Sequence, residues 1–258
     1  MSNLKRPEYH QSQIAMYLKC PKSWRFRYVD GVVTPPKAAL TVGNAVDSAV
    51  TNNLIQKLRT GVDLSQADVI DVYSTDFDVR AKETAWGDDD AGKQKDMGVK
   101  LITAHHEQLA PKIDPATVQE KFRLETDMGY DLGGTIDLTE KDGTVADTKT
   151  SKNAYAEDAI SRALQPALYD FAFKALYGQP AKAFRYDVLI KPTVRNPVRV
   201  QQITAKVTPA DTEWLFDTIN NVHKAITAGV DSPAPDGAWW CGKDWCGFWS
   251  MCKGKDRK

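Results

Sequence analysis

The placement of four cysteines restricts the fold of this 258-residue chain more than any other feature of its sequence. Cys20 stands alone near the start, whereas Cys241, Cys246 and Cys252 follow within the last eighteen residues. Disulfide frameworks usually spread their cysteines through a small secreted chain, which this is not. Zinc normally uses two close cysteine pairs, but an iron–sulfur cluster can take its ligands from distant segments. We therefore expect an iron–sulfur cluster, with zinc, disulfides or unpaired thiols as the alternatives.

Aromatic residues gather around the three closing cysteines. Four of the seven tryptophans lie there together with Phe248, namely Trp239, Trp240, Trp245 and Trp249. We expect them to form an apolar jacket that keeps water away from the cluster. The alternative is a platform on which nucleic-acid bases stack.

The overall composition is that of an ordinary soluble globular protein, with 42% hydrophobic and 26% charged residues. No apolar run approaches the length of a transmembrane helix, and the start lacks the apolar core of a secretion signal. We therefore expect a cytoplasmic protein with no membrane partner. The formal net charge is zero, so overall charge alone indicates no nucleic-acid partner. Residues 1–37 are nevertheless basic and residues 60–98 acidic, so a neutral total can hide two oppositely charged faces.

Hydrophobic periodicity predicts a chain that begins with helices and continues as an α/β domain. Residues 60–98 are weakly periodic and are expected to be rich in loops. Helices are predicted at 12–18, 43–58, 95–109, 157–176 and 208–229, and strands at 118–124, 130–139, 144–150, 184–190 and 198–207. Pro166 is expected to kink or split the helix that contains it.

Asp147 and Lys149 lie in one predicted strand, so their side chains project from the same face. The residues before them are small or apolar, and charges on a partly buried face are costly unless they are paired or bind a metal. Asp137 ends the preceding strand, and its position depends on the turn. A two-residue turn places it opposite Thr148, whereas a three-residue turn with a left-handed Gly143 places it opposite Asp147. Facing carboxylates repel each other and become favourable when Mg2+ or Mn2+ lies between them.

Glu120 lies on the apolar side of another predicted strand, with the apolar residues at 118, 122 and 124. An acidic group there is either directed at the same site or shows that the predicted register is wrong. Taken alone, these charged residues are also compatible with a solvated hairpin.

The order of these motifs resembles the PD-(D/E)xK nuclease superfamily, specifically its RecB-like branch with a four-cysteine iron–sulfur cluster. That branch includes CRISPR adaptation exonucleases and phage recombination nucleases. The resemblance covers almost the whole chain: an opening cysteine motif, a glycine helix, paired metal and lysine motifs, a glutamine–tyrosine helix and closing cysteines. In that order the residues are Tyr17-Leu-Lys-Cys20-Pro21, Gly43-Asn-Ala-Val-Asp47, Gly134-Thr-Ile-Asp137, Asp147-Thr-Lys149, Gln165 with Tyr169, and Cys241, Cys246 and Cys252.

The resemblance implies a restriction-endonuclease-like core, in which helices flank a mixed central sheet. It also implies a structural cluster that joins Cys20 to the C-terminal tail. We accordingly expect one nuclease domain over 1–258, with a helical part at 1–115, a catalytic α/β core at 116–230 and a cysteine-rich tail at 231–258.

The implied chemistry is metal-assisted hydrolysis of a phosphodiester bond. Asp137, Asp147 and the Thr148 carbonyl would hold the cation. Lys149 would position the attacking water or stabilise the charge that develops on the phosphate.

Gln165 and Tyr169 would orient that lysine or a DNA phosphate. Asp47 stands where the family usually carries a histidine. It is interpreted as a third oxygen ligand for the metal, as an exposed helix residue, or as a sign of weakened activity. Because the other catalytic motifs are present, we favour an active enzyme.

The leading hypothesis is a metal-dependent DNA exonuclease with a [4Fe-4S] cluster and Mg2+ or Mn2+, acting on free DNA ends in phage or mobile-element recombination. The alternatives are a nuclease-like module that holds DNA or a partner helicase without cutting, and a redox protein. His10, His105, His106 and His223 lie outside the motifs and are interpreted as ordinary surface or core residues.

Overall fold

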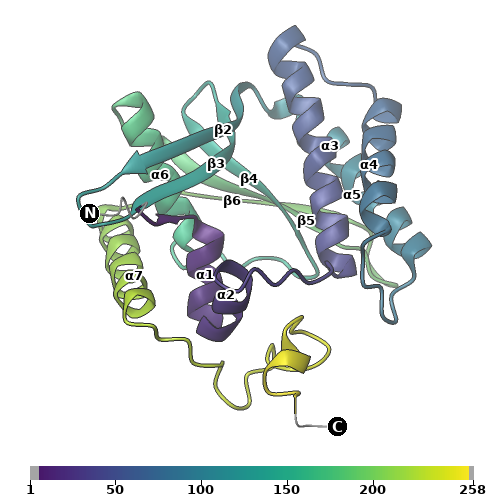
Figure 1. The fold of residues 1–258 in the computed structure, drawn as a ribbon. Helices are drawn as coiled ribbons and strands as arrows, with labels where there is room; N and C mark the ends of the chain where they lie inside the picture. Colours follow the sequence, from purple (N-terminus) through teal and green to yellow (C-terminus); the bar gives the residue numbers. More distant parts are fainter. Residues whose placement is uncertain (1–5, 256–258) are drawn as a thin grey trace. The chain divides into compact units, whose positions relative to one another are not determined.

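A computed structural model describes residues 6–255 (Figure 1). The chain divides into two compact units, each assembled from separate stretches of sequence. One unit comprises the described residues up to 35, residues 123–134 and residues from 210 onwards; the other comprises residues 36–122 and 135–209. Within the described residues, no helix is long and apolar enough to cross a membrane.

The described strands form a mixed sheet of six strands in the order β1-β3-β4-β5-β6, with β2 paired to β3. Their bounds are β1 (Glu8–Tyr9), β2 (Pro115–Glu125), β3 (Asp131–Glu140), β4 (Thr144–Ser151), β5 (Ala183–Ile190) and β6 (Arg199–Ala205). Strands β4 and β5 are parallel, and helix α6 (Leu164–Tyr177) lies in the crossover that such a pair requires. Strands β3 and β6 pair antiparallel with β4 and β5, respectively. The expected mixed α/β core is therefore confirmed.

Three helices cover one side of β4 and β5 in the second unit (Figure 1). They are α3 (Ala38–Thr60), α4 (Gln66–Ala81) and α5 (Ala91–Gln108), which is followed by the short helix η1 (Ala110–Lys112). Their shared core includes Val46, Tyr73 and Leu101, which pack with Ala146 of β4 and Leu189 of β5. This packing places α3 against the strands that contain the predicted carboxylates.

Helix α6 packs on the opposite face of β5. Tyr169 of α6 meets Phe122 edge-on and lies against Phe184, with ring centroids 6.3 Å apart in each case. Because neighbouring residues of a strand point to opposite faces, Phe184 and Leu189 lie on different sides of β5. Helices therefore flank both faces of the sheet.

The expectation of a loop-rich segment over residues 60–98 is wrong, because this stretch contains α4 and the first part of α5. Buried Val69, Tyr73 and Phe77 recur at four-residue spacing and form the inner face of α4. The Ser65 side chain caps the helix by accepting a hydrogen bond from the Asp68 N–H. Ile70, Val72 and Val79 add further apolar side chains outside this spacing, which is why the periodicity is weak in the sequence.

Helix α6 begins at Leu164 rather than at residue 157, so Pro166 neither kinks nor splits it. The proline lies in the first turn, where backbone N–H groups have no partner within the helix and the missing N–H costs nothing. Residues 157–163 form turns instead.

The first unit contains β1, α1 (Gln11–Lys19), α2 (Pro21–Tyr28), α7 (Pro209–Thr227) and the short helix η2 (Trp249–Met251). Two contacts hold the segment after α7 to the N-terminal helices. The Tyr17 hydroxyl donates a hydrogen bond to the Val230 carbonyl at 2.6 Å, and Lys22 pairs with Asp231 at 2.8 Å. The opening and closing parts of the chain therefore fold together.

Candidate active site

A cavity of about 420 Å³ in the second unit gathers most of the predicted catalytic residues. Helix α3 contributes Gly43 and Asp47 to its walls, and α6 contributes Gln165 and Tyr169. Strand β3 adds Asp137, and β4 adds Asp147, Thr148 and Lys149. Four elements separated by up to 126 positions in the sequence thus converge on one concave surface.

Asp137 and Asp147 face each other across β3 and β4. Leu138 pairs with Ala146, and this register sets Asp137 opposite Asp147. The turn has three residues and Gly143 is left-handed at φ +85°, so the second of the two turns considered is the one present. The two carboxyl groups are therefore close enough to interact directly.

The surroundings of Asp137 raise its pKa. Burial raises the pKa of Asp137, and the hydrogen bond and charge of Asp147 raise it further. A cation between the two carboxyl groups would relieve the repulsion that contributes to this rise.

The Lys149 side chain places a positive charge beside the carboxyl groups of Asp137 and Asp147. Its Nζ lies 2.6 Å from Oδ2 of Asp147, whose side chain is buried. Burial disfavours the Lys149 cation, but Asp147 and then Asp137 outweigh that effect, so the pKa of Lys149 is raised. The side chain therefore stays protonated at neutral pH and can donate hydrogen bonds to an anion.

Asp47 belongs to the same electrostatic group. It is solvent-accessible because it faces the open cavity, yet the surrounding walls desolvate its carboxyl group and raise its pKa, and Asp147 adds to the rise. Close packing brings its helix to the strand: a Cβ on Gly43 would lie 3.3 Å from Oγ1 of Thr150. Asp47 therefore lines the cavity and is exposed to it.

Gln165 and Tyr169 are one helical turn apart and are hydrogen-bonded to each other. Burial raises the pKa of Tyr169, and the nearby Asp137 adds to the rise, so the phenol remains neutral. These two side chains bring neutral hydrogen-bonding groups to the cavity that also holds Asp137, Asp147 and Lys149.

Gln119 contacts Asp137, and no pattern in the sequence predicted this contact. Its amide donates to Oδ1 of Asp137 at 3.2 Å and to Oγ1 of Thr51 at 3.3 Å. Gln119 has a left-handed backbone conformation with φ +54°. No other non-glycine residue that the structure describes has a positive φ. This conformation interrupts the alternation of β2, so simple strand periodicity could not identify the residue.

Glu120, which we expected at the site, does not line the cavity. Its carboxylate accepts hydrogen bonds from the Tyr177 hydroxyl at 2.7 Å and from the Thr117 hydroxyl at 3.0 Å. The left-handed Gln119 immediately before it breaks the two-residue period on which the expectation rested.

The paired carboxylates offer hard oxygen donors. Within the described residues, no group of three or more His, Cys, Asp or Glu side chains is arranged as a metal site. Magnesium does not require such a group, because it usually binds through one or two carboxylates and keeps several waters. Facing carboxylates repel each other, and a cation between them relieves that repulsion. The donor set therefore fits Mg2+ or Mn2+.

The four cysteines belong to the first unit and are free thiols. Burial raises the pKa of the Cys241 thiol, and Cys246, Cys20 and Cys252 each add to the rise, so the four residues are neighbours. Over the described ranges they are not arranged as a metal-binding group. The thiols match the donor chemistry of an iron–sulfur or zinc site, and the cluster itself remains a proposal.

The aromatic residues enclose the cysteines only in part. Phe248 is buried and stacks on Phe26 at 5.6 Å between ring centroids. Trp240 lines a cavity of about 150 Å³ that also contains Cys20 and Cys246. Trp239 is 66% exposed, so this part of the expected jacket is open to solvent.

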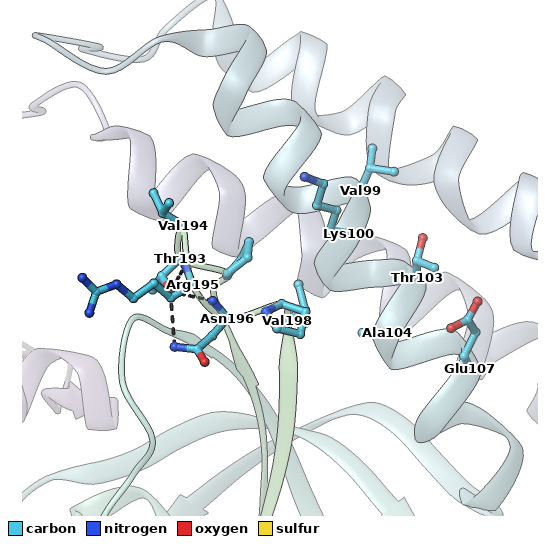
Figure 2. A pocket seen from close by; sticks show the side chains of 12 residues that line it. Val99, Lys100, Thr103, Ala104, Glu107, Thr193, Val194, Arg195, Asn196 and Val198 are labelled. Atoms are coloured by element: carbon cyan, nitrogen blue, oxygen red, sulfur yellow. Dashed lines mark hydrogen bonds between the residues drawn. The ribbon is translucent and has the colours of Figure 1, made fainter.

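A larger cavity of about 650 Å³ lies elsewhere in the second unit, between α5 and the loop that joins β5 to β6 (Figure 2). None of the predicted catalytic residues lines it. Its size alone therefore does not make it the catalytic site. The remaining histidines also lie outside the 420 Å³ cavity. His105 is buried, and His106 contacts the Leu64 carbonyl at 2.8 Å.

An α/β fold with two facing carboxylates and a lysine on adjacent strands defines a hydrolytic type of site, and comparison with known families gives its class. Residues 10–253 match the PD-(D/E)XK nuclease superfamily. The match covers nearly the whole chain, and the protein belongs to that superfamily.

Solved structures support the fold. A candidate exonuclease from Eubacterium rectale has 13% sequence identity and a TM-score of 0.61, covering 92% of this chain and 87% of its own. A structure named SSO0001 has 13% identity and covers 99% of this chain and 89% of its own, but its TM-score of 0.44 is too low to carry an argument. No curated protein matches the sequence.

Proposed function

We propose that this protein is a metal-dependent DNA exonuclease that hydrolyses phosphodiester bonds at free DNA ends. The observation that carries the proposal is the facing pair Asp137 and Asp147, with Lys149 2.6 Å from Asp147, in a cavity of a PD-(D/E)XK superfamily protein. The Eubacterium rectale structure, described as a candidate exonuclease, shares this fold and supports the choice of exonuclease.

Each cavity residue has a role in this proposal. Asp137, Asp147 and the Thr148 carbonyl would hold Mg2+ or Mn2+, with Asp47 as a further oxygen donor. When bound, the cation supplies polarisation of the phosphate and lowers the pKa of a coordinated water. Lys149, kept protonated by its acidic neighbours, stabilises the negative charge that builds up on the phosphate.

Gln165 and Tyr169 orient other groups in the cavity. Both are neutral hydrogen-bonding groups beside Asp137, and their mutual hydrogen bond fixes the two side chains on one face of α6. They hold Lys149 or a DNA phosphate in position.

We further propose a structural [4Fe-4S] cluster on Cys20, Cys241, Cys246 and Cys252, and a role in phage or mobile-element DNA recombination. Four neighbouring free thiols support the cluster. The resemblance to phage recombination nucleases supports the biological role, in which a helicase or recombination protein would be a further partner.

Digestion of end-labelled DNA tests the function. The wild type should release nucleotides with Mg2+ or Mn2+, and Lys149→Ala or Asp147→Asn should each reduce the rate on the order of a hundredfold or more. DNA binding measured without divalent metal should be nearly unchanged in both variants, because phosphate contacts elsewhere supply most of the affinity.

A wild type that binds DNA but releases no nucleotide with either metal would favour the non-cutting, nuclease-like binding module. Cleavage of closed circular DNA at the rate of linear DNA would contradict action at free ends. Glu120→Gln serves as the control, because this carboxylate lies outside the cavity and its loss should leave the rate within about twofold of the wild type.

A further inference from the structure

Two lysines stand at corresponding positions at the ends of neighbouring parallel strands. Strand β4 ends at Ser151 and β5 ends at Ile190, and these two residues pair in register. Lys152 and Lys191 are therefore the first residues beyond each strand. The Lys191 N–H donates to the Ser151 carbonyl at 2.8 Å. Because paired strands lie about 5 Å apart, the two lysines leave the same edge of the sheet side by side.

Two arginines extend this basic group. Arg199 begins β6 and pairs with Ile190, and Arg195 lies in the loop between β5 and β6. Every charged residue from position 188 to 209 is basic. Lys152, Arg195 and Arg199 are exposed, and Lys191 is half-buried. These four residues are called the strand-end cations below.

Several basic residues of the same unit pair with acids, and among the described residues the strand-end cations do not. Lys141 lies 2.7 Å from Asp114, and Lys182 lies 2.6 Å from Asp142. In the part of the chain that the structure describes, the strand-end cations form no such ion pair. Neighbouring like charges without an acidic partner repel each other and favour a bound anion.

The titration of Lys191 agrees with this arrangement. Burial lowers its pKa, the like charge of Lys152 lowers it further, and Asp89 partly opposes both effects. An anion between the two lysines would relieve their repulsion.

We propose that the strand-end cations bind the phosphate backbone of the DNA strand that enters the cleavage cavity. This inference rests on the proposed function, because β4 also carries Asp147 and Lys149. Lys152 follows Lys149 by three residues and lies just past the end of β4, so the contacted phosphates lie a few nucleotides from the scissile bond.

The loop that carries Arg195 also presents it outward. Figure 2 shows the loop as one wall of the 650 Å³ cavity and α5 as the other, with the Arg195 side chain extending away from α5. The adjacent Val194 is fully exposed. Pro192 and Pro197 restrict the backbone of the loop. The guanidinium is therefore accessible from outside the cavity.

The test is the salt dependence of DNA binding by the full chain without divalent metal, measured with a fluorescent oligonucleotide. Each phosphate contact contributes about 0.7–0.9 to the slope of log affinity against log salt. Lys152→Gln combined with Lys191→Gln should lower that slope by about 1.5. Between about 50 and 200 mM salt, the double variant should then lose roughly eightfold less affinity than the wild type.

Two further variants make the test specific. Arg199→Gln, on the neighbouring strand, should lower the slope by about 0.8 without either lysine change. Lys141→Gln is the matched control, because Lys141 is exposed and lies in the turn before β4, at the other end of that strand from Lys152. Its slope should equal that of the wild type.

A second measurement separates this inference from the proposed function. A small chromogenic phosphodiester cannot reach the strand-end cations, so the double variant should cleave it at the wild-type rate while its KM for DNA rises. Wild-type cleavage of DNA together with an unchanged slope in the double variant would overturn the subsite alone. A wild type that cleaves neither substrate would overturn both the proposed function and the subsite.

Discussion

Gln119 shows how one residue can be strained and useful at once. A left-handed backbone costs a non-glycine residue about 1 kcal/mol or more, and Gln119 adopts it at φ +54°. In return its amide reaches Asp137 and Thr51, at 3.2 and 3.3 Å. The amide therefore occupies one oxygen of Asp137, a residue that lines the cavity.

We predict that Gln119→Gly and Gln119→Ala separate these two effects. Both variants lose the amide, so both should lose roughly tenfold or more in nuclease activity, as is typical when a group that orients a metal ligand is removed. Only glycine relieves the left-handed strain, so Gln119→Gly should be more stable than Gln119→Ala by about 1 kcal/mol. Urea unfolding and DNA digestion measure the two quantities, and activities that follow stability would show that Gln119 has only a structural role.

His105 makes stability depend on pH. It is fully buried, and burial lowers its pKa from 6.5 to about 4, against the opposing effect of Asp187. Below pH about 6.5 the unfolded chain binds a proton that the folded chain does not, so folding stability falls as pH falls toward 4. The contribution is at most about 3 kcal/mol.

We predict that His105→Gln flattens the pH dependence of the unfolding free energy between about pH 4 and 6.5, because glutamine does not titrate. Equal slopes in the wild type and in this variant would assign the pH dependence to other groups.

At the scale of elements, the packing of α4 on α5 depends on a missing side chain. A Cβ on Gly98 of α5 would lie 1.8 Å from the Tyr73 hydroxyl oxygen, and Tyr73 of α4 is fully buried. Glycine costs a helix about 1 kcal/mol relative to alanine. The free energy gained by packing the two helices closely outweighs that cost.

We predict that Gly98→Ala destabilises the protein by about 1–2 kcal/mol, because overpacking exceeds the gain in helix propensity. Gly92→Ala, which meets only the side chain of Asp90 in the first turn of α5, should be neutral or stabilising. Combining Gly98→Ala with Tyr73→Leu should cost less than the sum of the two single changes. A stabilised Gly98→Ala protein in thermal or urea unfolding would contradict the close packing.

At the scale of the whole molecule, the thiols lie at the two ends of the sequence and fold in one unit. Cys20 precedes α2, and the other three cysteines follow α7. Joining such distant residues restricts the unfolded chain strongly, because the cost of closing a loop grows with its length. A centre at these thiols would therefore act mainly on folding.

We predict that anaerobically purified protein is brown and contains about four irons per chain. Cys246→Ser should lose most of the iron and much of the soluble yield, because the site holds both ends of the chain. Metal analysis and absorbance near about 400 nm measure the first effect. Zinc in place of iron in the wild type would replace this assignment with the zinc alternative.

The sequence by itself determined the parts of this protein that depend on local pattern. Strand alternation placed Asp147 and Lys149 on one face, and the left-handed preference of Gly143 made the three-residue turn one of two alternatives. The motif order indicated the superfamily that the whole-chain match then established. These features follow from neighbours within a few residues or from their order, so no tertiary contact is needed to see them.

Only the tertiary structure decided the parts that depend on contacts between distant residues. The pairing of β3 with β4 selects the three-residue turn, which places Asp137 opposite Asp147. Helix α4 has a buried side that appears only when α3 and α5 pack on it. Gln119 reaches Asp137, and Glu120 turns to Tyr177, because one left-handed residue interrupts β2. A backbone angle that costs energy locally is favoured only by distant hydrogen bonds, and local pattern contains no information about those bonds.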